Sequence, residues 1–506
     1  MRTHSFKILL STILVCLSWF PNFAQQPLKW RVGTNGEIDF TGITGTPILS
    51  NDSLYTTYVN VPFYDQQGNM KFFSNGIAVM DQNMDTLQNG ELYYNPSFTF
   101  PESGSNVING TLILPRPDYP DQFYIFHSSY TEPVPPAIIA YGDLYYSIID
   151  MSLNGGAGAI SNVKNVFLKD SLWTGNINAV RHGNGRDWWL ITGKNLSDTI
   201  YTWLVTKDSI FGPYGQAKGW AFSTSGNVVW QTAFNETGSK FAIAYAYQTG
   251  NIKRLLLTDF NRCTGELANG QLLTMTDIGT GVWQQGVSGV AFAKHGRFLY
   301  AGTGSSCYQF DLNTGNIQAS RVKVGDHDHL PTPFSSGFSN MKLGPDGKVY
   351  CQTANGNYTI DVINYPDSIG LGCDVQLRQI DFYSLFGAGA INIAILPHYP
   401  NYWLGALTGS PCDTLVGVGV SNIEEIKLSV APNPVKDFFT VSFPVQNHEG
   451  TLEVINSLGE IVIQTSVSPW SQFKKLNLRN FPTGLYFCKM KWKEKQAVVR
   501  VMKIEE

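Results

Sequence analysis

The most regular feature of the chain is a pair of short apolar segments separated by a turn that contains glycine. Hydrophobic and polar residues alternate within these segments, as in β-strands that place one face on a core. The turn glycine recurs as Gly185, Gly238, Gly296 and Gly347, so neighbouring copies lie 51 to 58 residues apart. The copies cover residues 63–73, 179–191, 232–244, 290–301 and 341–351.

This period of about 50 residues predicts a β-propeller, in which each repeat supplies the four short strands of one blade. Two weaker copies, residues 118–121 and 397–401, use Pro with Asp or Asn in the turn and fall near the expected phase. Together the copies predict about seven blades, and six or eight stay open.

A ring of blades has to close, because an incomplete last blade leaves unpaired backbone groups at a sheet edge. We expect an N-terminal strand around Trp30 to complete the final blade, after residues 391–395, since the two ends of a ring meet in space. Trp30 would then be buried between the first and last blades. The propeller is expected to span residues 25–415.

Composition supports many short strands joined by tight turns. Aromatic residues make up 13% of the chain and charged residues 15%, with 49 Gly and 25 Pro. The net charge is −4, and it becomes −6 without Arg2 and Lys7, the only Lys or Arg before residue 25. We expect no nucleic-acid partner, which would require a basic stripe.

The first 24 residues indicate a signal peptide. Arg2 and Lys7 precede an apolar run over residues 8–20, which is too short for a transmembrane span, and no other apolar stretch is long enough to span a bilayer. Export would bring the six remaining cysteines into an oxidising compartment, where disulfides can form. We expect a bridge between Cys373 and Cys412, which flank the last blade.

A second unit follows the Gly-containing linker at residues 416–425. Residues 426–506 hold seven short alternating segments punctuated by Pro and Gly. About 80 residues with this pattern predict a small immunoglobulin-like β-sandwich.

Three motifs of this second unit resemble the type A C-terminal sorting domain of type IX secretion. They are Ala-Pro-Asn-Pro at 431–434, Ser-Leu-Gly-Glu-Ile-Val at 457–462 and Leu-Arg-Asn-Phe-Pro-Thr-Gly-Leu-Tyr-Phe at 478–487. Two positions depart from the family: Ala431 replaces an aromatic residue, and Asn456 replaces a common Asp. The motif residues that the resemblance carries over are Pro432, Asn433, Pro434, Gly459, Pro482, Gly484, Tyr486 and Lys503.

The resemblance implies that the chain passes through the periplasm to the type IX secretion machinery and becomes secreted or displayed on the outer-membrane cell surface. The propeller resembles extracellular proteins that carry this tail, which implies an architecture and a destination without a defined activity.

Candidate chemistry in the propeller is sparse, and we predict no catalytic residue, metal site or cofactor. Asp326-His327-Asp328-His329 is the densest set of metal-capable side chains, but a strand would turn its His and Asp residues to opposite faces. Residues 311–315 fit a hairpin turn better than a calcium loop. Tryptophans of the middle blades are expected mainly in the core.

Three classes of function remain. We favour a non-catalytic binding or adhesion module with a glycan or protein ligand in the propeller. The alternatives are a secreted hydrolase or lyase acting on polysaccharide, and a structural component of the surface layer. Convergent acids in the central channel would favour the enzyme.

Overall fold

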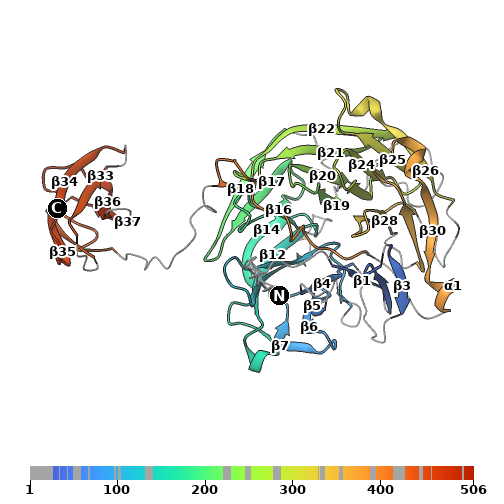
Figure 1. Ribbon diagram of the computed structural model, residues 1–506, viewed down its shortest axis with the longest axis horizontal. Helices are drawn as coiled ribbons and strands as arrows, with labels where there is room; N and C mark the ends of the chain where they lie inside the picture. Colours follow the sequence, from blue (N-terminus) through green and yellow to red (C-terminus); the bar gives the residue numbers. More distant parts are fainter. Residues whose placement is uncertain are drawn as a thin grey trace, which may run out of the picture. The chain divides into compact units, whose positions relative to one another are not determined.

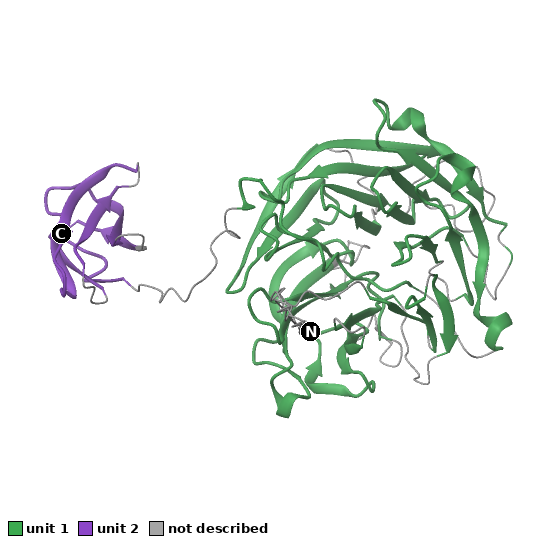
Figure 2. Cartoon of the chain, viewed as in Figure 1, with its two compact units in different colours: residues 1–417 green, residues 418–506 purple. Residues whose placement is uncertain are grey.

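The computed structural model describes residues 27–505 except 34, 43, 50–57, 66–68, 96–98, 101–103, 132–140, 220–228, 246–251, 277–285, 329, 331–336, 353–356, 388–394, 414–427, 444–447, 457–458 and 493–494. The chain forms two compact units, residues 1–417 and 418–506 (Figure 2). The predicted signal peptide and linker lie outside the described residues. No described helix is both long and apolar enough to cross a membrane.

Antiparallel sheets of four strands, set side by side around a centre, dominate the first unit (Figure 1). Four consecutive sheets run in sequence order. They are β15 (Asn178–Arg181), β16 (Trp188–Gly193), β17 (Thr199–Val205) and β18 (Ile210–Ala217); β19 (Val229–Phe234), β20 (Lys240–Tyr245), β21 (Ile252–Phe260) and β22 (Leu267–Thr276); β23 (Gly289–Phe292), β24 (Phe298–Gly302), β25 (Ser306–Asp311) and β26 (Val322–Asp326); β27 (Met341–Leu343), β28 (Val349–Cys351), β29 (Thr359–Ile363) and β30 (Val375–Asp381), which the short helix α1 (Phe382–Phe386) follows.

Three further sets of strands precede these sheets. They are β1 (Lys29–Val32), β2 (Gly36–Asp39) and β3 (Thr46–Leu49); β4 (Val61–Tyr64), β5 (Met70–Ser74), β6 (Ala78–Asp81) and β7 (Thr86–Glu91); β10 (Thr111–Pro115), β11 (Gln122–Thr131), β12 (Tyr141–Asp150) and β14 (Val166–Leu172). Strand β13 (Ala159–Ile160) pairs with both β12 and β7, so the last two sets form one nine-stranded sheet. Strands β8 (Thr99–Phe100) and β9 (Gly104–Ser105) pair separately. The predicted all-β propeller is confirmed; its number of blades stays a prediction.

The glycines that set the sequence period occupy equivalent turns. Gly185, Gly238, Gly296 and Gly347 each lie between the first and second strands of a four-stranded sheet, with φ between +69° and +81°. Because side chains disfavour this left-handed conformation, glycine is the residue that suits the turn.

The core lies between neighbouring sheets, whose first strands β15, β19, β23 and β27 pack against one another in succession. Trp188, Trp189 and Trp203 are buried there, which confirms the core prediction for them. Trp220 and Trp283 lie outside the described residues.

Trp30 is fully buried, as expected. Its ring packs edge-on against Phe40 of the N-terminal sheet and against Tyr350 of β28, so it joins the first and last sheets. Strand β1 itself pairs with β2. Its predicted pairing with the final blade concerns residues 391–395, of which 391–394 lie outside the described residues.

Residues 395–413, here called the crossing segment, form no strand and run through the centre of the ring (Figure 1). Its backbone and side chains contact first strands or adjoining residues from several sheets: His398 N donates to Asn60 O at 2.8 Å, and the Tyr402 hydroxyl donates to Ile113 O at 2.8 Å. The prediction that residues 397–401 form a blade turn is therefore wrong. The Pro and Asn residues there belong instead to a segment without strands that lines the central cavity.

The second unit has two sheets, a three-stranded and a four-stranded one. The first contains β31 (Ser429–Ala431), β32 (Phe438–Ser442) and β35 (Phe473–Asn477); the second contains β34 (Ile461–Val467), β33 (Gly450–Ile455), β36 (Gly484–Trp492) and β37 (Lys495–Lys503). Buried apolar side chains from both sheets, including Phe439, Val454 and Trp492, form one core. This arrangement confirms the predicted sandwich.

Candidate functional site

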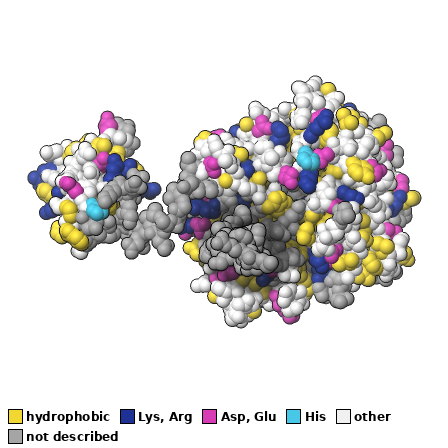
Figure 3. Space-filling view, viewed as in Figure 1, with side chains coloured by type: hydrophobic (Ala, Val, Ile, Leu, Met, Phe, Trp, Pro, Cys, Tyr) yellow, Lys and Arg dark blue, Asp and Glu magenta, His cyan; other side chains and the backbone are white. Residues whose placement is uncertain are grey.

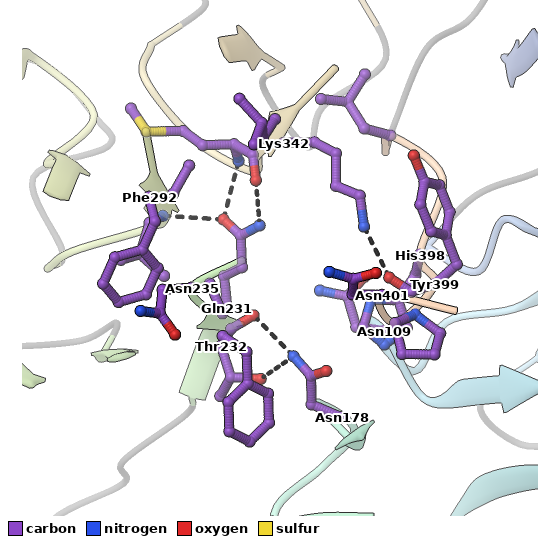
Figure 4. A pocket seen from close by; sticks show the side chains of 18 of the residues that line it. Asn109, Asn178, Gln231, Thr232, Asn235, Phe292, Lys342, His398, Tyr399 and Asn401 are labelled. Carbon is purple, nitrogen blue, oxygen red and sulfur yellow. Dashed lines mark hydrogen bonds between the residues drawn. The ribbon is translucent and has the colours of Figure 1, made fainter. Parts of the chain in front are cut away.

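A cavity of about 130 Å³ lies in the centre of the propeller (Figure 4). Strands β15, β19, β23 and β27 provide one part of its wall, and residues 396–401 of the crossing segment provide another. A single water molecule needs roughly 10–15 Å³ by the same measure, so the cavity has room for several waters or one small ligand.

Amide side chains hold the cavity wall together. Gln231 of β19 donates to Met341 O at 2.6 Å and accepts from the backbone N–H groups of Val290 and Met341. One side chain thus ties three neighbouring sheets to each other. Asn178 of β15 donates to the backbone oxygen of Thr232 at 3.1 Å in the same way. These amides are satisfied by the protein, so their role is structural.

Lys342 and His398 both line the cavity, and the Lys342 side chain points toward the segment that carries His398 and Tyr399 (Figure 4). Lys342 Nζ donates to Tyr399 O at 2.9 Å and lies 3.7 Å from the centre of the Tyr399 ring. Burial lowers the pKa of Lys342 to about 7. Burial, together with the nearby Lys342 charge, lowers the pKa of His398 to about 3, so this imidazole is neutral at physiological pH.

Sequence reasoning missed this site. Its residues come from separate stretches between Asn109 and Trp403, and none of them forms a local motif. The one signal in the sequence is the crossing segment's run of Pro, His, Tyr and Asn at residues 397–401, whose composition also suits a turn.

Among residues 326–328, His327 and Asp328 lie near each other, with the ring nitrogen 3.7 Å from the carboxylate. His327 is also buried 3.3 Å from the carboxylate of Asp361, and Asp328 pairs with Arg378 at 2.6 Å. The hydrogen bonds from Arg378 hold the pKa of Asp328 at about 2. The last residue of the Asp-His-Asp-His segment lies outside the described residues, which contain no group of three or more His, Cys, Asp or Glu side chains placed to hold a metal ion.

Residues 311–315 form a turn between β25 and β26, in agreement with the hairpin prediction. The Asp311 carboxylate accepts from Asn313 N at 3.0 Å and from Arg297 at 2.7 Å. Its oxygens are therefore already used inside the protein.

The cysteine pairing differs from the prediction. Cys412 is bonded to Cys263, in the turn between β21 and β22, and Cys373 is a buried free thiol. The expected bridge between Cys373 and Cys412 is wrong because the crossing segment carries Cys412 through the channel to a different sheet. Cys373 lies in the core between two neighbouring sheets, with Cys307 of β25 and Cys351 of β28.

The motif residues of the second unit connect its two ends. The Asn433 side chain donates to Arg500 O at 3.0 Å and accepts from Met502 N at 2.8 Å, and Val435 bridges to Lys503. The Pro-Asn-Pro loop is thereby attached to the final strand β37. Pro432 and Pro434 flank this asparagine, and neither has a backbone N–H group that could donate a hydrogen bond.

Lys503 and Tyr486 stabilise the second hairpin motif. Lys503 is buried, and its Nζ donates to Leu478 O at 2.8 Å and to Arg479 O at 3.2 Å. The Tyr486 hydroxyl donates to Pro482 O at 2.7 Å. The two glycines of the motifs lie at bends. Gly459 has φ +86° in the turn before β34, and Gly484 has φ +147° at the start of β36.

Comparison with known protein families supports the resemblance of the second unit to a sorting domain. Residues 429–504 match the secretion system C-terminal sorting domain. No curated protein matches the chain in sequence.

Several solved structures resemble the chain distantly. A putative 6-phosphogluconolactonase from Bacteroides uniformis is 15% identical with a TM-score of 0.44, over 74% of this chain and 99% of that one. A functionally unknown protein from Desulfotomaculum acetoxidans is 13% identical with a TM-score of 0.35, over 75% of this chain and 98% of that one. An oligogalacturonate lyase in complex with manganese is 10% identical with a TM-score of 0.33, over 63% and 78%. The matched motif and the sandwich that carries it identify residues 429–504 as a type IX secretion C-terminal sorting domain, which implies that the chain is secreted or attached to the cell surface.

Proposed function

We propose that the exported propeller is a non-catalytic binding module and that its ligand, a glycan unit, occupies the central cavity. The observation that carries this proposal is the character of the cavity wall. Asn109 and Asn340 contribute amide groups to the wall beside Lys342 and His398. Amide, imidazole and ammonium groups that can bond hydroxyl groups suit a carbohydrate.

The single carboxylate among the described residues of the wall, Glu236, favours binding over hydrolysis. Glycoside hydrolysis uses a pair of carboxylates that flank the scissile bond. A secreted hydrolase or lyase remains the alternative, and it makes a different experimental prediction.

A glycan array probed with the mature full-length protein would test the proposal, followed by calorimetry on each hit. We expect a bound glycan that mass spectrometry finds unchanged after prolonged incubation. The variant Asn401→Trp, which places a large ring in the cavity, should abolish binding while retaining the melting temperature to within a few degrees. Glu236→Gln should bind as the parent does. If the parent protein cleaves the glycan and the Glu236→Gln variant does not, the hydrolase or lyase alternative would be supported instead.

A further inference from the structure

Lys342 is a cation whose environment lacks an anion. Its ammonium group contacts a carbonyl oxygen and an aromatic ring, both of Tyr399. In the described part of the chain, no carboxylate lies within ion-pair distance of Lys342, and Glu236, on the same cavity wall, forms no ion pair with it. Elsewhere, lysines such as Lys323, which pairs with Asp326 at 2.6 Å, have a carboxylate partner.

The outer surface of the propeller shows a different distribution of charge. Basic and acidic side chains are interspersed over the face seen in Figure 3. An ammonium group inside a cavity, away from such partners, loses part of its hydration without a compensating charge, which is costly. A ligand that carries a negative charge would remove this cost.

Three further polar atoms of the wall have no protein partner among the described residues. His398 donates from Nε2 to Ile177 O at 2.8 Å, which leaves the lone pair of Nδ1 as an acceptor. Asn109 uses its Nδ2 as a donor to Asn176, and Asn340 uses its Oδ1 as an acceptor from Leu396 N. Asn109 Oδ1 and Asn340 Nδ2 therefore stay available to a ligand. This mixture of donors and acceptors suits hydroxyl groups, which can do both.

We propose that the ligand of the cavity is a sugar acid, whose carboxylate pairs with Lys342 and whose hydroxyl groups bond with His398, Asn109 and Asn340. This inference rests on the proposed function and names the ligand's chemical class. One lysine balances one negative charge, so a monocarboxylate fits better than a doubly charged phosphate ester. The sugar acid can be a free monosaccharide or the end of an acidic polysaccharide.

The pH dependence follows from the groups that face Lys342. Because the pKa of Lys342 is lowered to about 7, the lysine is charged below that pH and must take up a proton on binding above it. His398 stays neutral, and burial raises the pKa of Tyr399, so neither changes charge between pH 6 and 8. Glu236 is the remaining titratable side chain on the wall, and Glu236→Gln shows whether it contributes.

The test compares matched neutral and acidic sugars by calorimetry on the mature full-length protein. The pairs are glucose with glucuronate and galactose with galacturonate, each as monosaccharide and as short oligosaccharide, with glucose 6-phosphate as the doubly charged probe. We expect the uronate of at least one pair to bind at least tenfold more tightly than its neutral partner. Lys342→Met should reduce this preference to about one, and the preference of the parent should fall as the pH rises from 6 to 8.

The matched control is Lys323→Met, which removes an outer lysine and should leave the preference unchanged. Equal affinity for neutral and acidic sugars, a preference that survives Lys342→Met, or stronger binding of glucose 6-phosphate than of the uronates would overturn the sugar-acid inference and leave glycan binding intact. Failure of every sugar and oligosaccharide, on the panel and on the array, to bind the folded protein would overturn the proposed function as well. Short oligosaccharides that bind where monosaccharides do not would assign the site to a polysaccharide end.

Discussion

The indole Nε1 of Trp30 donates a hydrogen bond of 2.9 Å to the hydroxyl of Tyr399, 369 positions away in the sequence. Trp30 belongs to the first strand of the propeller and Tyr399 to the crossing segment, and both side chains are buried. Tyr399 in turn receives a hydrogen bond from Lys342 through its backbone oxygen. The closure of the ring and the cavity wall therefore share one residue.

Trp30→Ala should destabilise the propeller by about 3–5 kcal/mol, because a fully buried indole is replaced by a void. Tyr399→Phe removes only the hydroxyl and should cost about 1 kcal/mol. Urea unfolding followed by tryptophan fluorescence measures both. An unchanged unfolding midpoint for Trp30→Ala would show that the N-terminal sheet is not part of the cooperative fold.

The Cys263–Cys412 disulfide should stabilise the propeller by on the order of 3–5 kcal/mol, since it closes a loop with a sequence separation of 149. Reductant should lower the melting temperature of the parent and leave the double variant Cys263→Ser/Cys412→Ser unaffected. Alkylation of the native protein should spare Cys307, Cys351 and Cys373, because burial raises the pKa of these thiols. A peptide that links Cys373 to Cys412 would contradict the structure.

Lys503→Met should destabilise the sorting domain by about 1–3 kcal/mol, because two backbone carbonyls lose a buried donor. Lys475→Met, at an exposed lysine of β35, is the control and should have little effect. We expect deletion of residues 426–506 to retain the protein in the periplasm and Lys503→Met to reduce its export. Immunoblots of periplasmic and secreted fractions measure both. Normal secretion of the deletion variant would remove the sorting role.

The ion pair between Asp328 and Arg378 predicts a specific acid sensitivity. The pKa of Asp328, about 2, lies below the usual value for aspartate. The ion pair therefore stabilises the fold above about pH 4 and ceases to do so as the pH falls through 2. Asp328→Asn should therefore cost less than about 1 kcal/mol at pH 7, given its partial exposure, and progressively less as the pH falls toward 2. Unfolding of parent and variant at both pH values checks the sign. A cost that grows with acid would contradict the assignment.

The sequence predicted the repeating parts of this fold better than the parts that occur once. Gly296 and Gly347 occupy the same left-handed turn position in neighbouring sheets, so their spacing reports the period directly. Asn433 and Lys503 belong to motifs whose hydrogen bonds are local to one small domain.

The cavity and the disulfide could not be predicted in this way. His398 lies in a stretch whose composition suits a turn on the rim as well as an extended segment in the channel, and only the surrounding sheets distinguish the two. The partner of Cys412 depends on the path of that segment, which no local pattern records. Lys342 is likewise one lysine among many until its neighbours are known.

The position of the crossing segment sets the order in which the molecule can assemble. Residues 395–413 are the last part of the first unit to leave the ribosome and, in a chain translocated from its N-terminus, the last to arrive on the other side. Until they do, Trp30 has no hydroxyl to bond, Cys263 has no second sulfur, and the cavity lacks one wall. A propeller with its central cavity walled and its disulfide closed therefore exists only in a chain that has been completed through the crossing segment, immediately ahead of the sorting domain.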